Sequence, residues 1–425
     1  MNLFSEQYAQ ASDKNDPLKE YRFQFKLKDP NLIYLDGNSL GALPTKTVER
    51  INDVINKEWG DHLIRSWNQG WYSRSQEISA KIAKLIGAQP DEVIITDSTS
   101  VNLFKLAYGA LKLQDGKTGI VSDELNFPSD IYLLQGLREM FGNKHNLKLA
   151  KSVDNISVSM EELKTCIDNN TALVTLSHVV FRSAFMYDMQ EVNQLAHSKN
   201  ALTLWDLSHA AGAVPIELNK WNTDLAIGCT YKYLNGGPGS LAFLYVRKDL
   251  QEKLQQPIWG WFGEKNPFDF GLDYHPAQGI RKFLAGTPPI ISLSAIEPAI
   301  NMILDAGMKK IRTKSIDQVN YFIALFEQEL EPIGYKLGTP KNDKERGSHI
   351  SIKHKEAYRI CKALINPQID GKVVVPDFRE PDNIRFGITP LYTTYSEIYE
   401  AVKQLKNIII NQYYLKISEQ KDDVT

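Results

Sequence analysis

Hydrophobic and polar positions follow two different periods between residues 45 and 250. Apolar side chains recur at helical spacing in four segments, residues 45–63, 73–88, 100–113 and 189–200. Short apolar runs rich in strand-forming residues lie between and after them, at 91–96, 118–127, 171–180, 201–208, 224–230 and 240–246. Helices that alternate with strands predict an α/β fold whose mostly parallel sheet is covered on both faces.

The pattern changes at about residue 290. A long helical stretch follows, and the remaining chain mixes helices with strand-like runs at 349–354, 372–378 and 383–389. This mixture predicts a second, smaller domain of the α+β class.

Polar and aromatic residues gather where the predicted strands end. In an open parallel sheet, ligands bind beyond the carboxyl ends of the strands. Simple turns at these places would favour glycine, proline and asparagine instead. The residues at these strand ends are Ser98 to Ser100, Phe127 to Asp130, Ser177 and His178, Asp206 to His209, and Tyr231 and Lys232.

Lys232 and Asp206 are the two most informative of these residues. Alone, Lys232 is explained as a solvated residue near a turn, because Asn235-Gly236 is a strong hairpin signal. Alone, Asp206 is explained equally well as a helix cap. Together they supply what a pyridoxal phosphate (PLP) enzyme needs. The lysine forms a Schiff base, and the carboxylate keeps the pyridine nitrogen protonated.

Two further segments suit the same cofactor. Thr99 and Ser100 stand where a strand gives way to a helix, and a helix N-terminus is a ready site for a phosphate group. The same hydroxyls are also ordinary helix caps. Phe127 follows a strand and could stack on the cofactor ring, although a single phenylalanine is more often part of the core.

Composition narrows the class of protein. The chain has 425 residues, of which 43% are hydrophobic and 24% charged, as in an ordinary globular protein. A formal charge of −2 gives no electrostatic footprint for nucleic acid or for an anionic membrane. Three scattered cysteines fit a reducing compartment. Neither a signal peptide nor a run of ~20 apolar residues is present, so we expect a cytoplasmic protein.

Seven motifs spread over most of the chain resemble the kynureninase family, a branch of the PLP-dependent aspartate aminotransferase superfamily. They are YLDGNSLGALP at 34–44, FPSD at 127–130, WDLSHAAGAVP at 205–215, CTYKYLNGGPG at 229–239, GWFG at 260–263, GTPPI at 286–290 and RFGITPLY at 385–392. The resemblance implies an aspartate aminotransferase-like fold. It implies hydrolysis of L-kynurenine to anthranilate and L-alanine in tryptophan catabolism, with the 3-hydroxy derivative as a second candidate substrate.

The resemblance also implies roles for single residues. Lys232 would be the Schiff-base lysine and would take the substrate Cα proton, Asp206 would pair with the pyridine nitrogen, and Tyr231 would protonate Cβ. Arg385 would bind the substrate carboxylate, which its planar fork suits. The matching cofactor positions are Thr99, Ser100, Phe127, Pro128, Ser129, Asp130, Ser177, Asp206, His209, Tyr231 and Lys232.

A homodimer with shared active sites is the assembly that the resemblance implies. Trp261 and Thr287 match positions that reach the cofactor phosphate of the neighbouring subunit. Trp67 matches a substrate-pocket position that is histidine in the animal enzymes, which also carry asparagine in place of Thr287. We therefore expect the bacterial type, which favours kynurenine over 3-hydroxykynurenine.

Three domain ranges follow from the pattern and the resemblance together. We expect an N-terminal segment that contributes to the small domain or to dimer contacts, a large PLP-binding domain and a small C-terminal domain. Their ranges are 1–45, 46–305 and 306–425.

Other chemistry on the same fold stays open at this stage. An aminotransferase would share the lysine and the aspartate. A cysteine desulfurase would need a thiol on a mobile loop, whereas Cys361 lies in a helical pattern and Cys229 precedes the lysine. A PLP-binding sensor would usually carry a DNA-binding module, and no basic helix-turn-helix segment is apparent.

Overall fold

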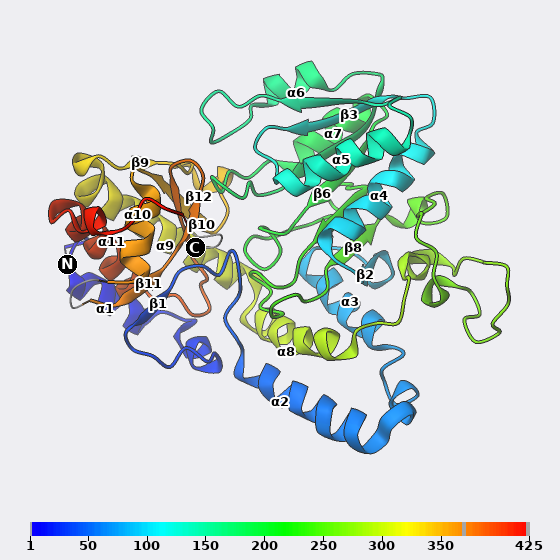
Figure 1. Ribbon diagram of the computed structural model, residues 1–425, viewed down its shortest axis with the longest axis horizontal. Helices are drawn as coiled ribbons and strands as arrows, with labels where there is room; N and C mark the ends of the chain where they lie inside the picture. Colours follow the sequence, from blue (N-terminus) through cyan, green and yellow to red (C-terminus); the bar gives the residue numbers. More distant parts are fainter. Residues whose placement is uncertain (1, 368–370, 422–425) are drawn as a thin grey trace.

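Two lobes make up the molecule (Figure 1). The computed structural model describes residues 2–367 and 371–421. A seven-stranded sheet with its helices forms the larger lobe, and the N-terminal segment lies with the C-terminal elements in the smaller lobe.

The large sheet has the strand order β2-β8-β7-β6-β5-β3-β4. Five neighbouring strands, from β7 to β4, run parallel, while β8 is antiparallel to both β7 and β2. The strands are β2 (Val93–Ile95), β3 (Gly119–Asp123), β4 (Asn146–Ala150), β5 (Thr171–Ser177), β6 (Leu202–Asp206), β7 (Leu225–Gly228) and β8 (Phe243–Val246).

Helices cover this sheet on both faces, because neighbouring residues of each strand join different hydrophobic clusters. Val93 and Ile95 belong to one cluster, and Ile94 between them belongs to another. The prediction of an α/β fold with a mostly parallel sheet is therefore confirmed. The principal helices of this lobe are α3 (Arg74–Leu85), α4 (Thr99–Leu113), α5 (Pro128–Met140), α6 (Met160–Cys166) and α7 (Met189–Ser198).

The connection between β7 and β8 differs from the hairpin that Asn235-Gly236 indicated. The two strands do pair antiparallel, but residues 229–242 separate them. Asn235 has the expected positive φ of 52° within this longer loop. The loop folds back on itself, since Gly236 N donates to Thr230 O at 2.8 Å. Lys232 lies inside this turn.

The long helical stretch after residue 290 is two helices. α8 (Ile290–Ala306) and α9 (Met308–Glu329) meet at Gly307, whose φ is 82°. Within residues 2–367 and 371–421, no single helix has the length and hydropathy needed to cross a membrane. The pair together passes that test by length and composition, with an 81° bend between the helices.

The smaller lobe is built on a four-stranded antiparallel sheet of order β12-β13-β10-β9. A separate strand from the N-terminal segment, β1 (Leu32–Tyr34), pairs in parallel with β11 (Val373–Val375). The other elements are β9 (Lys336–Leu337), β10 (His349–Lys353), β12 (Asp377–Arg379), β13 (Asn383–Gly387), α1 (Glu6–Asn15), α10 (Ala357–Ile365) and α11 (Tyr395–Ile410). The three proposed domain ranges stay a prediction.

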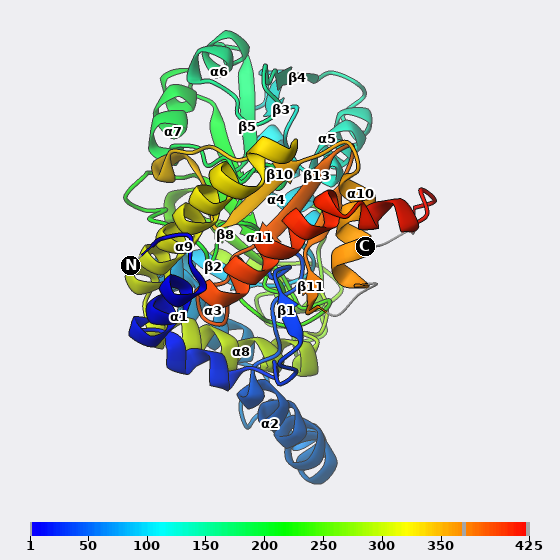
Figure 2. The ribbon, with the colours of Figure 1, turned by 90° about the vertical axis from the view of Figure 1, so that its left-hand side faces the viewer.

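An arm projects from the body of the molecule (Figure 2). It consists of α2 (Thr45–Asp53), a π-helical segment (Val54–His62) and a 3-10 helix (Leu63–Trp67). Several of its apolar side chains are exposed, among them Trp59 and Ile64, which are 56% and 76% exposed. The helical pattern predicted at 45–63 is present, although its second half is wound as a π-helix.

Candidate active site

The carboxyl ends of the central strands bring the predicted residues together. Ser177, the last residue of β5, is the register partner of Asp206, the last residue of β6. β7 ends at Gly228, three residues before Tyr231. Because these strands are parallel, their carboxyl ends lie at one edge of the sheet.

Lys232 is half-buried and points at His209. Its Nζ lies 2.8 Å from His209 Nε2 and 5.8 Å from the centre of the Tyr231 ring. Burial, followed by the charge of Lys232, lowers the pKa of His209 well below its ordinary value, so this imidazole is neutral. A neutral Nε2 accepts a hydrogen bond from the Lys232 ammonium. Lys232 is therefore held inside the site and is not a solvated turn residue.

Two buried carboxyl groups face the lysine. Ser208 donates to Asp206 Oδ1 from its backbone N at 2.8 Å and from its hydroxyl at 2.6 Å. Burial raises the pKa of Asp206, while Ser208 and the charge of Lys232 lower it in part. Burial and the charge of Asp206 raise the pKa of Asp130 well above its ordinary range. The charge of Asp206 therefore disfavours ionisation of Asp130.

Two helix N-termini meet near these acids. Ser98 caps α4 by accepting a bond from Val101 N at 3.4 Å, which leaves Thr99 and Ser100 in the first turn. Pro128 and Ser129 begin α5. Ser100 Oγ and Ser129 Oγ are 3.3 Å apart, so the two first turns adjoin. Helix N-termini that converge in this way suit a phosphate group.

Phe127 and Ser177 line the site from either side of Asn126. Ser177 Oγ donates to Asn126 Oδ1 at 2.7 Å, and Phe127 N donates to the same oxygen at 2.8 Å. The Phe127 ring is 44% exposed and meets Phe181 edge to face at 5.3 Å. Phe127 is thus not part of the core, and its exposed ring can stack on a flat ligand.

Arg385 reaches this region from β13 of the smaller lobe. It is fully buried, and it donates from Nε to Asp377 Oδ1 at 2.7 Å and from Nη2 to Asp377 Oδ2. Its Nη1 donates to Phe181 O, and its Nη2 also donates to Ser39 Oγ at 3.2 Å. Asp377 takes one edge of the guanidinium, and the other edge, formed by Nη1 and Nη2, faces Phe181 and Ser39.

The loop at residues 36–41 packs closely against the lysine-bearing loop of the larger lobe. Gly41 N donates to Tyr231 O at 2.7 Å. A Cβ on Gly41 would collide with the Lys232 carbonyl and lie 2.8 Å from Asn235 Cα. The motif DGNSLG therefore needs glycine at 41 for a close backbone approach. The sequence drew attention to the motif without indicating this reason.

Three predicted residues lie apart from the lysine. Trp67 packs against Phe262 at 5.8 Å, and Phe262 packs edge to face against Trp261 at 4.6 Å. Thr287 is exposed in the segment that precedes α8. Within the described part of the chain, the ring contacts of Trp67 and Trp261 are with other aromatic residues and do not include Lys232, Asp206 or Arg385.

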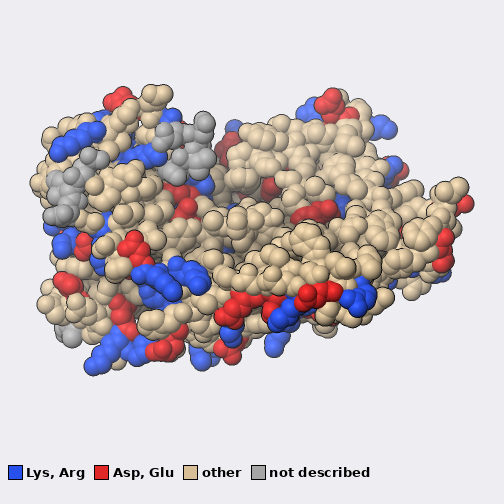
Figure 3. All heavy atoms as spheres, turned by 60° about the horizontal axis from the view of Figure 1, so that its bottom comes forward, with Lys and Arg blue, Asp and Glu red and all other residues tan. Residues whose placement is uncertain are grey.

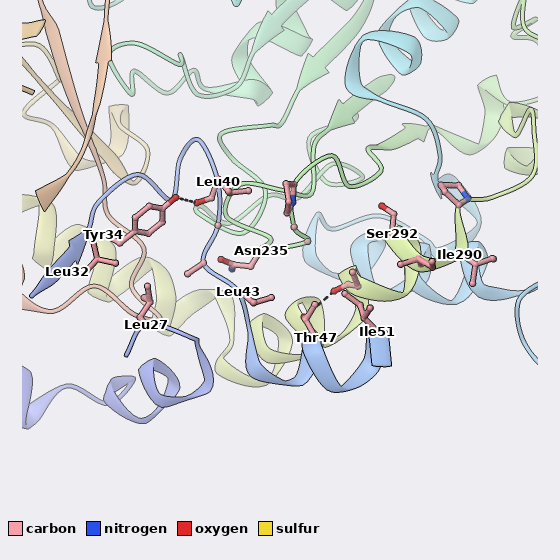
Figure 4. Close-up of a pocket in the computed structure, with 18 residues that line it drawn as sticks. Leu27, Leu32, Tyr34, Leu40, Leu43, Thr47, Ile51, Asn235, Ile290 and Ser292 are labelled. Atoms are coloured by element: carbon pink, nitrogen blue, oxygen red, sulfur yellow. Dashed lines mark hydrogen bonds between the residues drawn. The ribbon is translucent and has the colours of Figure 1, made fainter. Parts of the chain in front are cut away.

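An apolar groove lies beside the lysine-bearing loop (Figure 4). Its volume is about 870 Å³, and it lies between the 27–51 region, Asn235 to Pro238, and the start of α8. Tyr34 donates from its hydroxyl to Leu40 O at 2.6 Å along one wall. In Figure 3, uncharged side chains cover most of the middle of the face seen from below, and charged ones gather along its lower edge. Exposed apolar residues of the region include Leu40, Leu43, Ile55, Trp59, Leu63, Ile64 and Ile291.

The residues at the strand ends fit PLP. Asp130 Oδ2 is buried without a hydrogen-bond partner among the described residues, which indicates that a polar ligand belongs beside it. The converging helix N-termini fit its phosphate, Asp206 its pyridine nitrogen, Phe127 its ring face and Lys232 its aldehyde.

Comparison with known proteins places the chain in a family. The kynureninase of Pseudomonas fluorescens is 43% identical to it over 404 residues, which are 94% of each chain. The chain belongs to the kynureninase family. A kynureninase of Burkholderia mallei (strain SAVP1) is 42% identical over 406 residues, again 94% of each chain. The family model of the kynureninase C-terminal domain matches residues 311–405 of this kynureninase-family chain.

Solved structures of other proteins share the fold of this chain. A cysteine desulfurase from Thermococcus onnurineus NA1 superposes with a TM-score of 0.80 at 19% identity, over 92% of this chain and 98% of that one. A C-DES mutant with glycine covalently linked to the PLP cofactor has a TM-score of 0.78 at 17% identity, over 91% and 99%. At such identity the similarity establishes the fold, and the predicted aspartate aminotransferase-like architecture is confirmed.

Proposed function

We propose that this protein is a PLP-dependent hydrolase that converts L-kynurenine to anthranilate and L-alanine. The observation that carries the proposal is its 43% identity, over 94% of both chains, to a kynureninase. The arrangement of Lys232, Asp206 and Asp130 at the carboxyl edge of the sheet supports it. PLP, when bound, supplies an aldehyde that captures amino groups and a ring that accepts electrons from the substrate Cα.

The lysine and its neighbours supply the proton chemistry in this proposal. Lys232 would hold the cofactor through its amine, and the same amine would accept the proton released from the substrate Cα. Asp206 holds a proton on the cofactor's pyridine nitrogen. Burial raises the pKa of the Tyr231 phenol, so Tyr231 keeps its proton and can donate it to the substrate Cβ.

Arg385 binds the substrate carboxylate in this account. Asp377 occupies the Nε–Nη2 edge, so the carboxylate uses the Nη1–Nη2 edge, beside Ser39 and Phe181. An arginine fork favours such two-point binding. Asp377 fixes the plane of the guanidinium before substrate arrives, which reduces the entropy lost on binding.

The working form that we propose is a homodimer with shared active sites. The exposed apolar arm and the groove beside the lysine-bearing loop form a surface of the kind that a second subunit covers. Trp67 and Trp261 contact the same Phe262 ring, so both would enter the neighbouring site together. We also propose that Trp67 and Thr287 favour kynurenine over 3-hydroxykynurenine. A cytoplasmic location stays a prediction.

The desulfurase alternative finds no support at the cysteines. Cys229 and Cys361 are buried, and burial raises the pKa of both thiols. Cys166 lies at the end of α6 on the outer part of the large lobe. Neither buried cysteine is the exposed, activated thiol that attacks a substrate.

Anthranilate fluorescence tests the proposed function. The purified protein is loaded with PLP and mixed with L-kynurenine, with no keto acid present. We expect anthranilate to appear with L-alanine in equal amounts. PLP-loaded protein that forms product only when a keto acid is added would instead be an aminotransferase. A higher kcat/KM for 3-hydroxykynurenine than for kynurenine would contradict the specificity proposed for Trp67 and Thr287, and would leave the proposed hydrolysis unaffected.

A further inference from the structure

His349 is a buried imidazole that the proposed chemistry leaves unused. It is the first residue of β10 in the smaller lobe, and its side chain is fully buried. Neither ring nitrogen makes a well-formed hydrogen bond with the described residues, although the Phe181 backbone approaches the ring closely enough to raise the pKa of His349 in part. An unpaired polar group in the interior costs about 1–3 kcal/mol, so its presence needs a reason.

The His349 ring faces His209, which belongs to the larger lobe. The two ring centres are 5.4 Å apart, and their planes are inclined by 50°. His209 Nδ1 is also buried without a partner among the described residues. A ring-centre distance of 5.4 Å leaves room for an N–H···N hydrogen bond of ~3 Å between Nδ1 and a nitrogen of His349 if the rings turn about their soft χ2 torsions.

The state of protonation makes the two rings complementary. Lys232 Nζ donates to His209 Nε2, so a neutral His209 carries its proton on Nδ1 and is a donor there. Burial, followed by the charge of Arg385, lowers the pKa of His349 to about 3, so this ring is neutral and offers one acceptor nitrogen. The charged groups that influence the pair are Lys232 from the larger lobe and Arg385, Arg379 and Asp377 from the smaller lobe.

We propose that His349 is a positioning residue that accepts the Nδ1–H hydrogen bond of His209. This bond fixes the tautomer whose Nε2 lone pair is directed at Lys232. Without it, the His209 proton can move to Nε2, where it would repel the lysine ammonium and withdraw its acceptor. The inference rests on the proposed role of Lys232 and adds a residue from the other lobe to its surroundings.

Two variants separate this role from simple packing. His349→Leu fills the space and removes the acceptor, whereas His349→Gln keeps an acceptor oxygen. We expect kcat with L-kynurenine to fall about tenfold in His349→Leu, the value of one hydrogen bond, and to stay within about threefold in His349→Gln. The basic limb of the kcat pH profile should also move in His349→Leu alone. His145→Leu is the matched control, since His145 is another buried histidine with an unpaired Nδ1, at the opposite edge of the sheet.

Structure and spectroscopy of the PLP-loaded protein decide the matter independently of turnover. A crystal structure should show a His349 nitrogen within ~3.2 Å of His209 Nδ1. Nitrogen-15 spectra of histidine-labelled protein should show His209 protonated at Nδ1, with the proton redistributed in His349→Leu. A longer distance, a proton on Nε2, or a His349→Leu variant with unchanged tautomer and kcat would overturn the inference. If His349→Leu does not fold, the wild-type distance and spectrum decide. If the wild-type protein does not turn over kynurenine, the proposed function is wrong. The His209–His349 distance and the nitrogen-15 spectrum would still test the role of His349.

Discussion

Asp377 determines what the Arg385 guanidinium can bind. Both side chains are buried, and they share two hydrogen bonds along one edge of the fork. Arg379 also contacts Asp377, at 2.9 Å, so one carboxylate serves two arginines. Without Asp377, the guanidinium of Arg385 could turn, and it would bind the substrate carboxylate in several orientations. Only one of these orientations places the substrate correctly for reaction.

Replacement of Asp377 should therefore affect substrate binding more than turnover. In Asp377→Asn we expect KM for kynurenine to rise at least about tenfold while kcat changes less, because the positioned edge binds the carboxylate in ground and transition state alike. Steady-state kinetics measure the two constants. Glu380→Gln, which removes an exposed ion pair with Lys421, is the control and should change neither. An unchanged KM in Asp377→Asn would contradict this role for Asp377.

Asp36 makes the stability of the same region depend on pH. Burial, followed by the charge of Asp377, raises its pKa from 3.8 to about 7. Because the folded protein disfavours the ionised form, the contribution of Asp36 to stability is present at low pH and is lost as pH rises through about 7. Asp36→Asn cannot ionise. Relative to wild type, its free energy of unfolding should increase by about 2–4 kcal/mol between pH 5 and pH 8.

Denaturant unfolding at the two pH values measures this difference. Asp53→Asn is the control, because Asp53 is an exposed residue whose pKa its neighbour Lys57 lowers. A difference between Asp36→Asn and wild type that is the same at both pH values would refute the prediction.

At the scale of elements, the loop at 36–41 connects the lysine to the smaller lobe. Its Gly41 bonds to Tyr231, and its Ser39 donates to Asp377 Oδ2 at 2.7 Å. The loop thus touches the proposed base and the proposed carboxylate site within three residues. Its backbone can approach Lys232 so closely only where a side chain is absent.

A pair of glycine variants tests the loop. Gly41→Ala must push the backbone of Lys232 or Asn235 aside, and we expect it to cost about 1–3 kcal/mol of stability and to reduce kcat more than tenfold. Gly136→Ala, inside α5 with no atom near its added methyl group, should be neutral or stabilise by about 0.5–1 kcal/mol. Thermal unfolding and kinetics of both variants provide the comparison. Equal behaviour of the two would show that the loop is not tightly held.

At the scale of the whole molecule, shared sites predict complementation between two inactive variants. Lys232→Ala lacks the base, and Trp261→Ala lacks the residue that we expect to act in the neighbouring subunit. When the two variants are dissociated, combined in equal amounts and reassociated, half of the dimers contain one subunit of each variant. One of the two active sites in each such dimer is then intact. We expect about a quarter of wild-type activity to return. If Trp261 acts within its own subunit, no activity returns.

The sequence predicted the parts of the site that depend on strand ends, because periodicity locates where each strand stops. Ser177, Asp206 and Lys232 were found in this way, and the parallel sheet brings them together. Contacts between the two lobes could not be predicted, because they join residues that are far apart in the sequence and give no local sequence pattern. His209 and His349 are 140 positions apart in the sequence, and the pairing of Asp377 with Arg385 depends on two adjacent antiparallel strands.

Two elements were misjudged for identifiable reasons. The turn signal at Asn235-Gly236 is real, but it belongs to a longer loop whose length follows from packing against Gly41 and α8. The edge strand β4 escaped notice because its polar residues alternate with apolar ones over only five positions.

The covalent role of Lys232 is the claim on which the account rests, and borohydride reduction tests it most directly. Reduction of the PLP-loaded protein, followed by proteolysis and mass spectrometry, should find the pyridoxyl group on the peptide that contains Lys232. Lys232→Ala should carry no such group and should not form anthranilate. A pyridoxyl group on a different lysine, or a Lys232→Ala variant that still cleaves kynurenine, would contradict the account.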